Sequence, residues 1–378
     1  MIIRNANVYT ENGTFEKKDI YIEGDRITEA NSNDDTIINA EGFYAIPGLT
    51  DIHFHGCVGY DLCDGTHEAM EAMAEYQAKN GITAIVPATM TLDTDRLNTI
   101  FNSISSYPNK NGADFIGVNM EGPYLSPLKK GAQAAEYIKA PDIDHFKTMM
   151  HLSGNKIKLV SVAPEEENAI DFIKELHKEV VISIAHTTAD YNTTMDALKS
   201  GASHITHLYN AMPPFTHRSP GVIGAAFDWP NCTVELICDG IHIHPSVIRA
   251  TFQLFGDDRI ILISDSMMAT GLEDGEYTLG GQAVYVKGNQ ATLQDGTLAG
   301  SVTNLMNCMR HAIDVGIPLE SAVKCAAVNP VKKLGVYDKY GSITPGKYAN
   351  IVLLNKNYEP TSIILKGKLI HADKTNPA

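Results

Sequence analysis

Histidines and carboxylates of this sequence gather at the ends of short apolar runs. In the clearest case, Asp51-Ile52-His53-Phe54-His55-Gly56, two histidines lie two residues apart. Side chains of an extended strand alternate between its two faces, so we expect His53 and His55 to point to the same face. One divalent metal ion could then bind both imidazoles. The spacing alone leaves a second interpretation open, because two histidines can also coincide on a polar strand.

Other apolar runs end in the same kinds of side chain. These residues are Glu121, His186, His207, Asp239 and Asp265. A carboxylate such as Glu121 can bridge two cations, and it is costly to bury without a partner. Taken one at a time, Glu121 can be a loop acid, either histidine a core residue and Asp265 a helix cap. Taken together they predict a metal site, whereas His204 is expected to be structural because it falls on the opposite strand face from His207.

Asp265 is the candidate general base and acid. A bound cation lowers the pKa of a water molecule to about 7 in well-tuned zinc sites, and a neighbouring carboxylate can then shuttle the proton. Zinc, iron, cobalt and manganese all accept histidine and carboxylate ligands, so the residues do not identify the metal.

The composition limits the partners of the chain. It has 378 residues, 44% of them apolar, which suits one large domain with a smaller one. The net charge of −15 disfavours general binding to nucleic acid or to an anionic membrane. An anionic ligand must therefore be held by a few local cations.

The six cysteines have no CxxC spacing, and the first residues form no apolar signal core, so we expect a cytoplasmic protein.

The elements that must position these residues follow from periodicity. Short apolar runs alternate with helical patterns through the middle of the chain, which is typical of βα units and a parallel sheet. The predicted strands are residues 52–55, 84–88, 115–121, 158–163, 180–186, 204–207, 233–239 and 259–265. That number suits an α/β fold of the (β/α)8 TIM-like barrel type, whose active sites lie at the carboxyl ends of the strands. Both ends of the chain have the alternating pattern of antiparallel strands.

Several motifs carry a family resemblance over nearly the whole chain. They are Gly48 to Gly56, Glu121 to Leu125, Lys130-Gly131-Ala132, His207 to Met212, Asp239 to His242 and Ser264-Asp265. With them the chain resembles the N-acetylglucosamine-6-phosphate deacetylase family of the amidohydrolase superfamily. The resemblance implies a small β-sandwich domain formed by residues 1–49 and 336–378, beside a catalytic barrel of residues 50–335.

The resemblance also implies a ligand set and an activity. Glu121, His186 and His207 are expected to hold one divalent metal, and His53 and His55, with Glu121 as bridge, a second one. The implied reaction is hydrolysis of the acetamide of N-acetylglucosamine 6-phosphate by a metal-activated hydroxide. Glucosamine 6-phosphate and acetate are the products, in amino-sugar catabolism and cell-wall sugar recycling.

The implied partners are a sugar phosphate and a second copy of the chain, as a homodimer. The residues expected to contact the substrate are Asn210, Ala211, Arg218 and His242 at the phosphate, and Ala132, Leu298, Ala299 and Gly300 at the sugar. A guanidinium such as that of Arg218 can donate two hydrogen bonds to phosphate oxygens. The sequence departs from the family at Gln133, where some members have histidine, and at Cys57, where glycine is common.

Two alternatives stay open at this stage. One keeps the barrel but changes the substrate, as in cyclic-amide hydrolases or deaminases; many of the former bridge their metals with a carboxylated lysine, where this chain has Glu121. The other is a scaffold without catalysis, which tends to lose metal ligands that this chain keeps.

Overall fold

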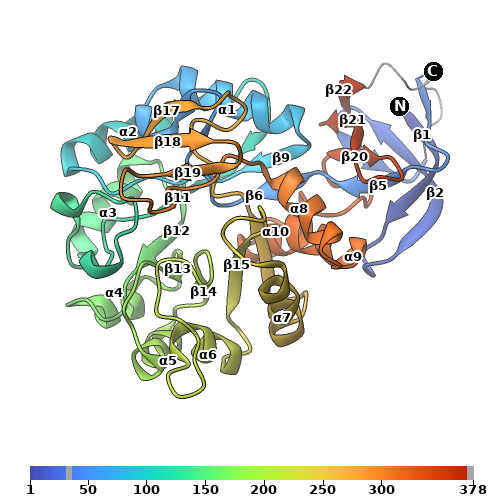
Figure 1. Cartoon of the computed structure of the whole chain (residues 1–378). Coiled ribbons are helices and arrows are strands. Elements are labelled where there is room, and N and C mark those ends of the chain that lie inside the picture. Colours follow the sequence, from blue (N-terminus) through green and yellow to red (C-terminus); the bar gives the residue numbers. More distant parts are fainter. Residues whose placement is uncertain (31–35, 373–378) are drawn as a thin grey trace.

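The computed structural model describes residues 1–30 and 36–372 of the chain. These residues form a mixed α/β fold with a curled parallel sheet, flanked on one side by a second sheet (Figure 1). Among the described residues, no helix combines the length and the apolar character needed to cross a membrane.

The parallel strands form the centre of the molecule. They are β6 (Leu49–Asp51), β9 (Ile82–Ile85), β10 (Asp114–Phe115), β11 (Val118–Met120), β12 (Ile157–Val162), β13 (Val181–Ile184), β14 (His204–Ile205), β15 (Thr233–Ile237) and β16 (Ile260–Ile263). One sheet has the order β10-β9-β6 and another runs from β11 to β16 in chain order. A parallel bridge between Ala88 and Asn119 joins the two sheets. Beyond β16, the backbone N–H of Asp265 donates to the carbonyl oxygen of His53 at 2.9 Å, so the segments after β16 and β6 meet.

Helices separate most of these strands in the sequence. They are α1 (His67–Lys79), α2 (Thr94–Ser106), α3 (Ile143–Leu152), α4 (Ala169–Leu176), α5 (Tyr191–Ser200), α6 (Gly221–Asp228), α7 (Pro245–Phe255), α8 (Leu305–Asp314), α9 (Leu319–Val323) and α10 (Asn329–Lys333). Several begin at a side-chain cap: Thr66 accepts from the Ala69 N–H, and Asp190 from the Thr193 N–H. Such caps satisfy backbone donors that the first helical turn leaves free.

The two ends of the chain share one sheet. Its strands are β1 (Ile2–Tyr9), β2 (Phe15–Glu23), β3 (Arg26–Thr28), β4 (Ile37–Asn39), β5 (Tyr44–Pro47), β20 (Ile351–Leu354), β21 (Pro360–Leu365) and β22 (Lys368–Ala372). Strand β5 pairs with β20, so the blue and red ends of the ribbon lie side by side in Figure 1. Residues such as Ile22 and Leu353 form a hydrophobic cluster of their own in this sheet. Residues 31–35 of the predicted first segment and 373–378 of the second lie outside the described part of the chain.

A small antiparallel sheet was not predicted. It consists of β17 (Gly275–Leu279), β18 (Gln282–Lys287) and β19 (Gln290–Thr292), and it follows β16 in the chain. A two-stranded ribbon of β7 (Gly56–Cys57) and β8 (Tyr60–Asp61) follows β6.

The predicted parallel strands are longer than the observed ones at their carboxyl ends. Strand β13 ends at Ile184 and β16 at Ile263, so His186 and Asp265 lie in the loops just beyond. The backbone φ angles of His186, His207 and Asp265 are 42°, 28° and 49°. A positive φ takes the chain out of the extended conformation, so these residues end the ladder. The candidate site residues therefore lie on the loops that follow the strands.

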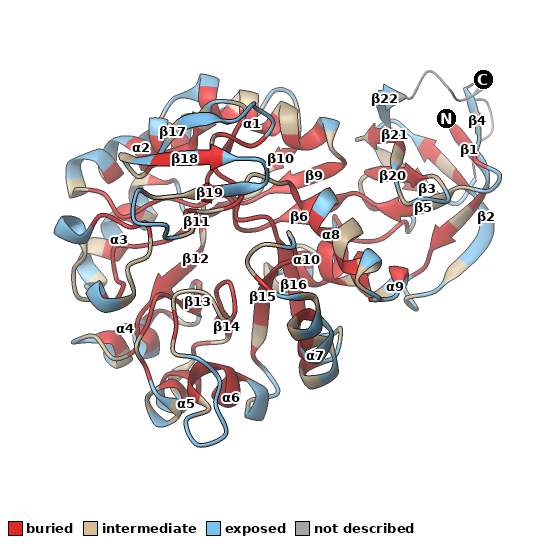
Figure 2. Ribbon diagram, viewed as in Figure 1, coloured by how far each residue is buried: buried red, intermediate tan, exposed pale blue. Residues whose placement is uncertain are grey.

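The two faces of a central strand contact different surroundings. Val234 and Leu236 of β15 belong to the large core that includes helix residues, whereas Ile237 packs with residues such as Ile261 in a separate cluster. Glu235 lies between Val234 and Leu236, so its side chain points to the other face of the strand. Figure 2 shows these central strands as buried and the outer faces of the helices as exposed.

Candidate active site

Two groups of imidazole and carboxylate side chains lie next to each other beyond the parallel strands. The first group is His53, His55 and Asp265, and the second is Glu121, His186 and His207. Within each group, one potential ligand atom of every residue lies within 4.8 Å of the others. All six side chains are buried. The structure therefore brings together all residues that the sequence analysis proposed as metal ligands, together with the proposed general base.

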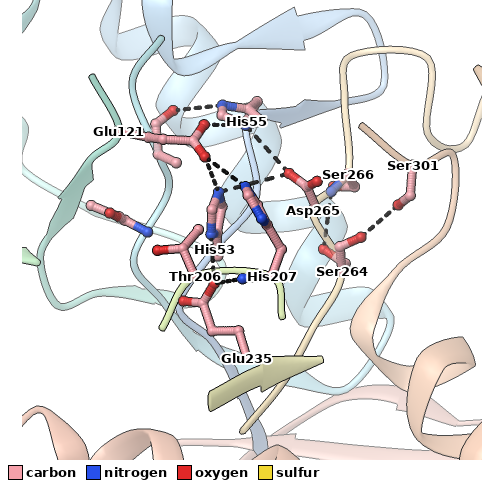
Figure 3. A network of polar contacts seen from close by, with 12 residues as sticks. His53, His55, Glu121, Thr206, His207, Glu235, Ser264, Asp265, Ser266 and Ser301 are labelled. Atoms are coloured by element: carbon pink, nitrogen blue, oxygen red, sulfur yellow. Dashed lines mark hydrogen bonds and ion pairs between the residues drawn. The ribbon is translucent and has the colours of Figure 1, made fainter. Parts of the chain in front are cut away.

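Glu121 lies between the two groups (Figure 3). Its Oε1 atom lies 3.2 Å from the Nε2 atoms of both His186 and His207. The same oxygen lies 3.4 Å from Nε2 of His53, and Oε2 lies 3.3 Å from Nε2 of His55. One carboxylate thus faces four imidazole nitrogens, which is the arrangement a bridging ligand needs.

The outer nitrogens of two histidines are held by carbonyl oxygens. His186 Nδ1 lies 2.8 Å from the Lys129 carbonyl oxygen, and His55 Nδ1 lies 3.3 Å from that of Ala88. A carbonyl oxygen can only accept, so each Nδ1 carries the proton. The Nε2 lone pair of a neutral ring is then directed into the site, as metal-ligating histidines require.

The inner nitrogens fit a cation better than they fit one another. The Nε2 atoms of His186 and His207 are 3.1 Å apart. Nε2 of His53 is buried and has no hydrogen-bond partner among the described residues. Lone pairs that converge in this way repel each other unless a proton or a metal ion lies between them. The donor set therefore fits one or two divalent cations.

The charges of the site favour the same interpretation. Burial opposes ionisation of Glu121, but the electrostatic attraction of His53 and the close contacts with the imidazoles of His186 and His207 hold its pKa well below the usual value. Burial opposes the charged form of His55, yet hydrogen bonds to Asp265 and Glu121 raise its pKa to about 10. The site thus holds carboxylates that stay ionised and stabilise positive charge around them.

A cavity of about 510 Å³ opens above the two groups. Six of the eight residues predicted to contact the substrate line it: Ala132, Asn210, Ala211, His242, Leu298 and Gly300. Ala299 is fully buried and does not line the cavity. Arg218 also lies outside its lining, on an exposed loop between His207 and α6.

His242 is oriented by Asp239. The Nδ1 atom of His242 lies 2.7 Å from Oδ2 of Asp239, and Oδ1 of Asp239 accepts from the backbone N–H groups of Ile241 and His242. Burial opposes the charged form of His242, but the hydrogen bond to Asp239 and the negative charges of Asp239 and Asp265 together raise its pKa. His242 can therefore offer a positive charge and a donor to a ligand in the cavity.

The sequence analysis missed several residues that contribute to the site. Lys129, Asp295 and Thr297 line the cavity; Lys129 ends a 3-10 helix of three residues, and the other two lie in a loop, so none belongs to a periodic pattern. Glu235 contacts both donor groups from below, through His53 Nδ1 and the His207 backbone. A charged residue inside the apolar run 233–237 was a signal that could have revealed it.

A curled parallel sheet with histidines and carboxylates grouped beyond its strands indicates a hydrolase that has candidate metal-binding groups. The chain belongs to the amidohydrolase family, because the sequence model of the Amidohydrolase family matches residues 44–370. Members of this family are generally metal-dependent.

Proteins with similar sequences support the same family assignment. The chain is 38% identical over 336 residues to N-acetylglucosamine-6-phosphate deacetylase of Bacillus subtilis (strain 168), covering 87% of this chain and 85% of that protein. It is 34% identical to N-acetylglucosamine-6-phosphate deacetylase of Vibrio furnissii, covering 88% and 84%. A solved structure from Mycobacterium smegmatis has a TM-score of 0.92 at 29% identity, covering 98% of this chain and 99% of that chain. It is a mutant N-acetyl-D-glucosamine-6-phosphate deacetylase in complex with N-acetyl-D-glucosamine-6-phosphate.

Proposed function

We propose that this protein hydrolyses the acetamide of N-acetylglucosamine 6-phosphate to glucosamine 6-phosphate and acetate, in amino-sugar catabolism and cell-wall sugar recycling. The observation that carries the proposal is the cavity above Glu121, His186, His207 and Asp265 in a chain whose relatives bear the name of that activity. A cyclic-amide hydrolase is a weaker candidate, because these named relatives span most of the chain.

Glu121, His186 and His207 would hold one divalent cation, and His53 and His55, with Glu121 shared, a second. Zinc, iron, cobalt and manganese all suit imidazole and carboxylate donors. A cation held by such a set of ligands would lower the pKa of a bound water molecule towards neutral pH. It would also stabilise negative charge that develops on a carbonyl oxygen.

Asp265 is the proposed proton carrier. Its Oδ1 atom lies 3.3 Å from Nε2 of His55, and the residue lines the cavity. Burial opposes its ionisation, but the hydrogen bond to His55 and the neighbouring imidazoles lower its pKa, so it starts as a carboxylate. It accepts a proton from the attacking water as the carbon–oxygen bond forms. It then returns this proton to the amide nitrogen as the carbon–nitrogen bond breaks, which leaves acetate and the amine.

The sugar phosphate is proposed to lie across the cavity. Ala132, Leu298, Ala299 and Gly300 would surround the sugar, and Asn210, Ala211, His242 and Arg218 the phosphate. Arg218 is exposed and lies apart from the cavity of its own chain, which suits a contact made within a homodimer. The homodimer and a cytoplasmic location remain predictions.

We further propose that residues 50–335 form a (β/α)8 barrel, and that residues 1–49 and 336–378 form a small β-sandwich domain. The run of neighbouring strands β6, β9 and β11 to β16, with the bond from Asp265 back to His53, supports the barrel. The separate hydrophobic cluster of the terminal sheet supports the second domain.

Acetate release tests the function. Purified protein is analysed for metal and assayed with N-acetylglucosamine 6-phosphate, its galactosamine epimer and unphosphorylated N-acetylglucosamine. We expect kcat/KM to be highest for a phosphorylated substrate, and Arg218→Ala to raise KM for that substrate alone. Equal rates with and without the phosphate would overturn the roles of Arg218 and His242. Absence of acetate release from all three substrates would overturn the activity.

A further inference from the structure

Glu235 lies beneath the two donor groups and apart from the substrate cavity. Its carboxylate comes from β15 and points into the interior that the parallel strands enclose (Figure 3). The side chain is fully buried, and it is not among the residues that line the cavity. Glu235 therefore cannot contact a substrate, and any influence it has on the reaction must pass through its neighbours.

One oxygen of Glu235 joins a member of each donor group. Its Oε2 atom accepts from Nδ1 of His53 at 2.9 Å and from the backbone N–H of His207 at 3.0 Å. The other oxygen, Oε1, lies 3.1 Å from Nε2 of His204. Figure 3 shows Glu235 on the side of His53 opposite to Glu121. His53 is thus held between two carboxylates, one at each ring nitrogen.

The contact between Glu235 and His53 determines which ring nitrogen of His53 carries the proton. A carboxylate accepts hydrogen bonds and does not donate them, so Nδ1 of His53 must be protonated. In a neutral ring the lone pair then lies on Nε2, which faces Glu121 at 3.4 Å. A negative charge at Nδ1 also makes Nε2 a stronger donor to a metal ion. Without Glu235, the proton could occupy Nε2 and prevent ligation.

A purely structural role explains the position less well. A carboxylate is costly to bury, and an apolar side chain could fill the same space in a sheet whose other face is apolar. A structural role also gives no reason for the contact with ligands from both groups. Resting on the metal roles proposed above, we infer that Glu235 is a positioning residue that makes His53 a ligand of the second cation and anchors the backbone of His207, a ligand of the first.

Glu235→Gln separates the charge from the hydrogen bonds. The amide oxygen can still accept from His53 and from the His207 backbone. The amide nitrogen then faces Nε2 of His204, which can accept once its own proton moves to Nδ1, 2.7 Å from Oγ1 of Thr233. The variant therefore keeps the geometry and loses the negative charge beside His53.

The experiment measures the affinity of each cation. Wild type and Glu235→Gln are stripped of metal and dialysed against buffered free Zn²⁺ over a range of concentrations, and bound zinc is counted per subunit. We expect two zinc ions in the wild type. In Glu235→Gln, we expect the affinity for the second ion to fall about 10–100-fold, the range typical of residues that orient a ligand. The affinity for the first ion should change less than about twofold, and kcat should fall with KM unchanged.

Ser183→Ala is the matched control. It removes a buried hydrogen bond of 2.6 Å to Thr206 on the neighbouring strand without touching a proposed ligand. It should lower thermal stability and leave both zinc affinities as in the wild type. Unchanged binding of both ions in Glu235→Gln would overturn the inference, and so would an equal loss of both. A wild type that binds one ion would overturn the second site and this inference, while acetate release would still report on the proposed function.

A second measurement needs no variant that alters Glu235. Imidazole ¹⁵N spectra of the zinc-loaded wild type, assigned through the signal lost in His53→Asn, report the protonation of each ring nitrogen. We expect His53 to be protonated at Nδ1 and not at Nε2. A proton on Nε2 of His53 would overturn the inference even if Glu235→Gln did not fold.

Discussion

The side-chain nitrogen of Gln133 donates to Oε2 of Glu121 at 2.9 Å, while its oxygen accepts from the backbone N–H of Thr91 at 2.7 Å. Both ends of the amide are thus held, and its orientation follows from its partners. Gln133 therefore supports the carboxylate that contacts both donor groups.

Replacing Gln133 by leucine should impair both stability and catalysis. The buried N–H of Thr91 loses its acceptor, which costs about 1–3 kcal/mol of unfolding free energy. Glu121 loses a donor that limits its rotation, so we expect kcat to fall about tenfold or more. Chemical unfolding and acetate release measure the two effects. Gln133→His serves as the control and should retain more activity than Gln133→Leu. Wild-type kcat in Gln133→Leu would contradict a supporting role.

Asp265→Asn tests the proton carrier. Asparagine has the same shape but cannot accept a proton near neutral pH, so kcat should fall about 10²–10⁴-fold. Metal content should remain near that of the wild type, because Glu121, His186 and His207 are unchanged, and binding of the sugar phosphate should persist. Metal analysis, calorimetry with substrate and acetate release check the three expectations. Full turnover in Asp265→Asn would remove Asp265 from the mechanism.

Strand-end chemistry was predictable from the sequence. The apolar runs that end in His53, Glu121, His186, His207 and Asp265 were recognisable without any coordinates. All five lie in one site, because the carboxyl ends of neighbouring parallel strands meet at one edge of a sheet. Periodicity did not predict where each strand ends. The strands end before His186, His207 and Asp265, whose φ angles are positive, and so earlier than predicted. A local turn of this kind cannot be recognised from the pattern of apolar residues.

Residues outside the strand ends were harder to predict. Glu235 lies inside an apolar run, and only its long-range contacts with His53 and His207 show what it does. Strands β17 to β19 precede Thr297 and Leu298 of the cavity wall, but short exposed strands resemble loops in the sequence. Tertiary contacts determine both features, and a single sequence does not reveal them.

Substrate affinity should depend on pH through His242. Its pKa is raised above the ordinary histidine value, because the hydrogen bond to Asp239 and the negative charges of Asp239 and Asp265 together outweigh burial. The imidazolium is therefore present at low pH and is lost as the pH rises through the raised value. The phosphate gains its second negative charge near about pH 6. We expect KM for the sugar phosphate to be lowest between these two pKa values and to increase at higher pH.

Asp239→Asn provides the matching test. The amide keeps an acceptor for the N–H groups of Ile241 and His242 but removes the charge beside the ring. Burial then dominates and the pKa of His242 falls, so the increase in KM should begin at lower pH. KM profiles of both proteins, with unphosphorylated N-acetylglucosamine as the control substrate, measure the shift. Identical profiles would contradict an electrostatic role of His242.

Removal of metal should lower both activity and stability. A cation that binds only the folded state stabilises it by about 2.7 kcal/mol when its free concentration is 100 times Kd. We therefore expect a strong chelator to abolish acetate release and to lower the melting temperature, and added Zn²⁺, Co²⁺ or Mn²⁺ to restore both. Asp265→Asn, which keeps the proposed ligands Glu121, His186 and His207, should show the same thermal shift. A melting temperature that does not respond to the chelator would contradict the proposed metal centre.

Replacing the histidines by amides should separate the two proposed cation sites. In His186→Asn, the group of Glu121, His186 and His207 loses a ligand, and a cation is worth several kcal/mol of transition-state stabilisation, so kcat should fall about 10³-fold or more. In the double variant His53→Asn with His55→Asn, the first group stays complete, because neither histidine belongs to it. We expect the double variant to bind one metal per subunit and to keep more than about a tenth of wild-type kcat, since a single cation supplies the chemistry. Metal analysis and acetate release distinguish the two variants. If both lost activity equally, the reaction would need His53 and His55 as much as it needs His186, and the first cation alone would not suffice.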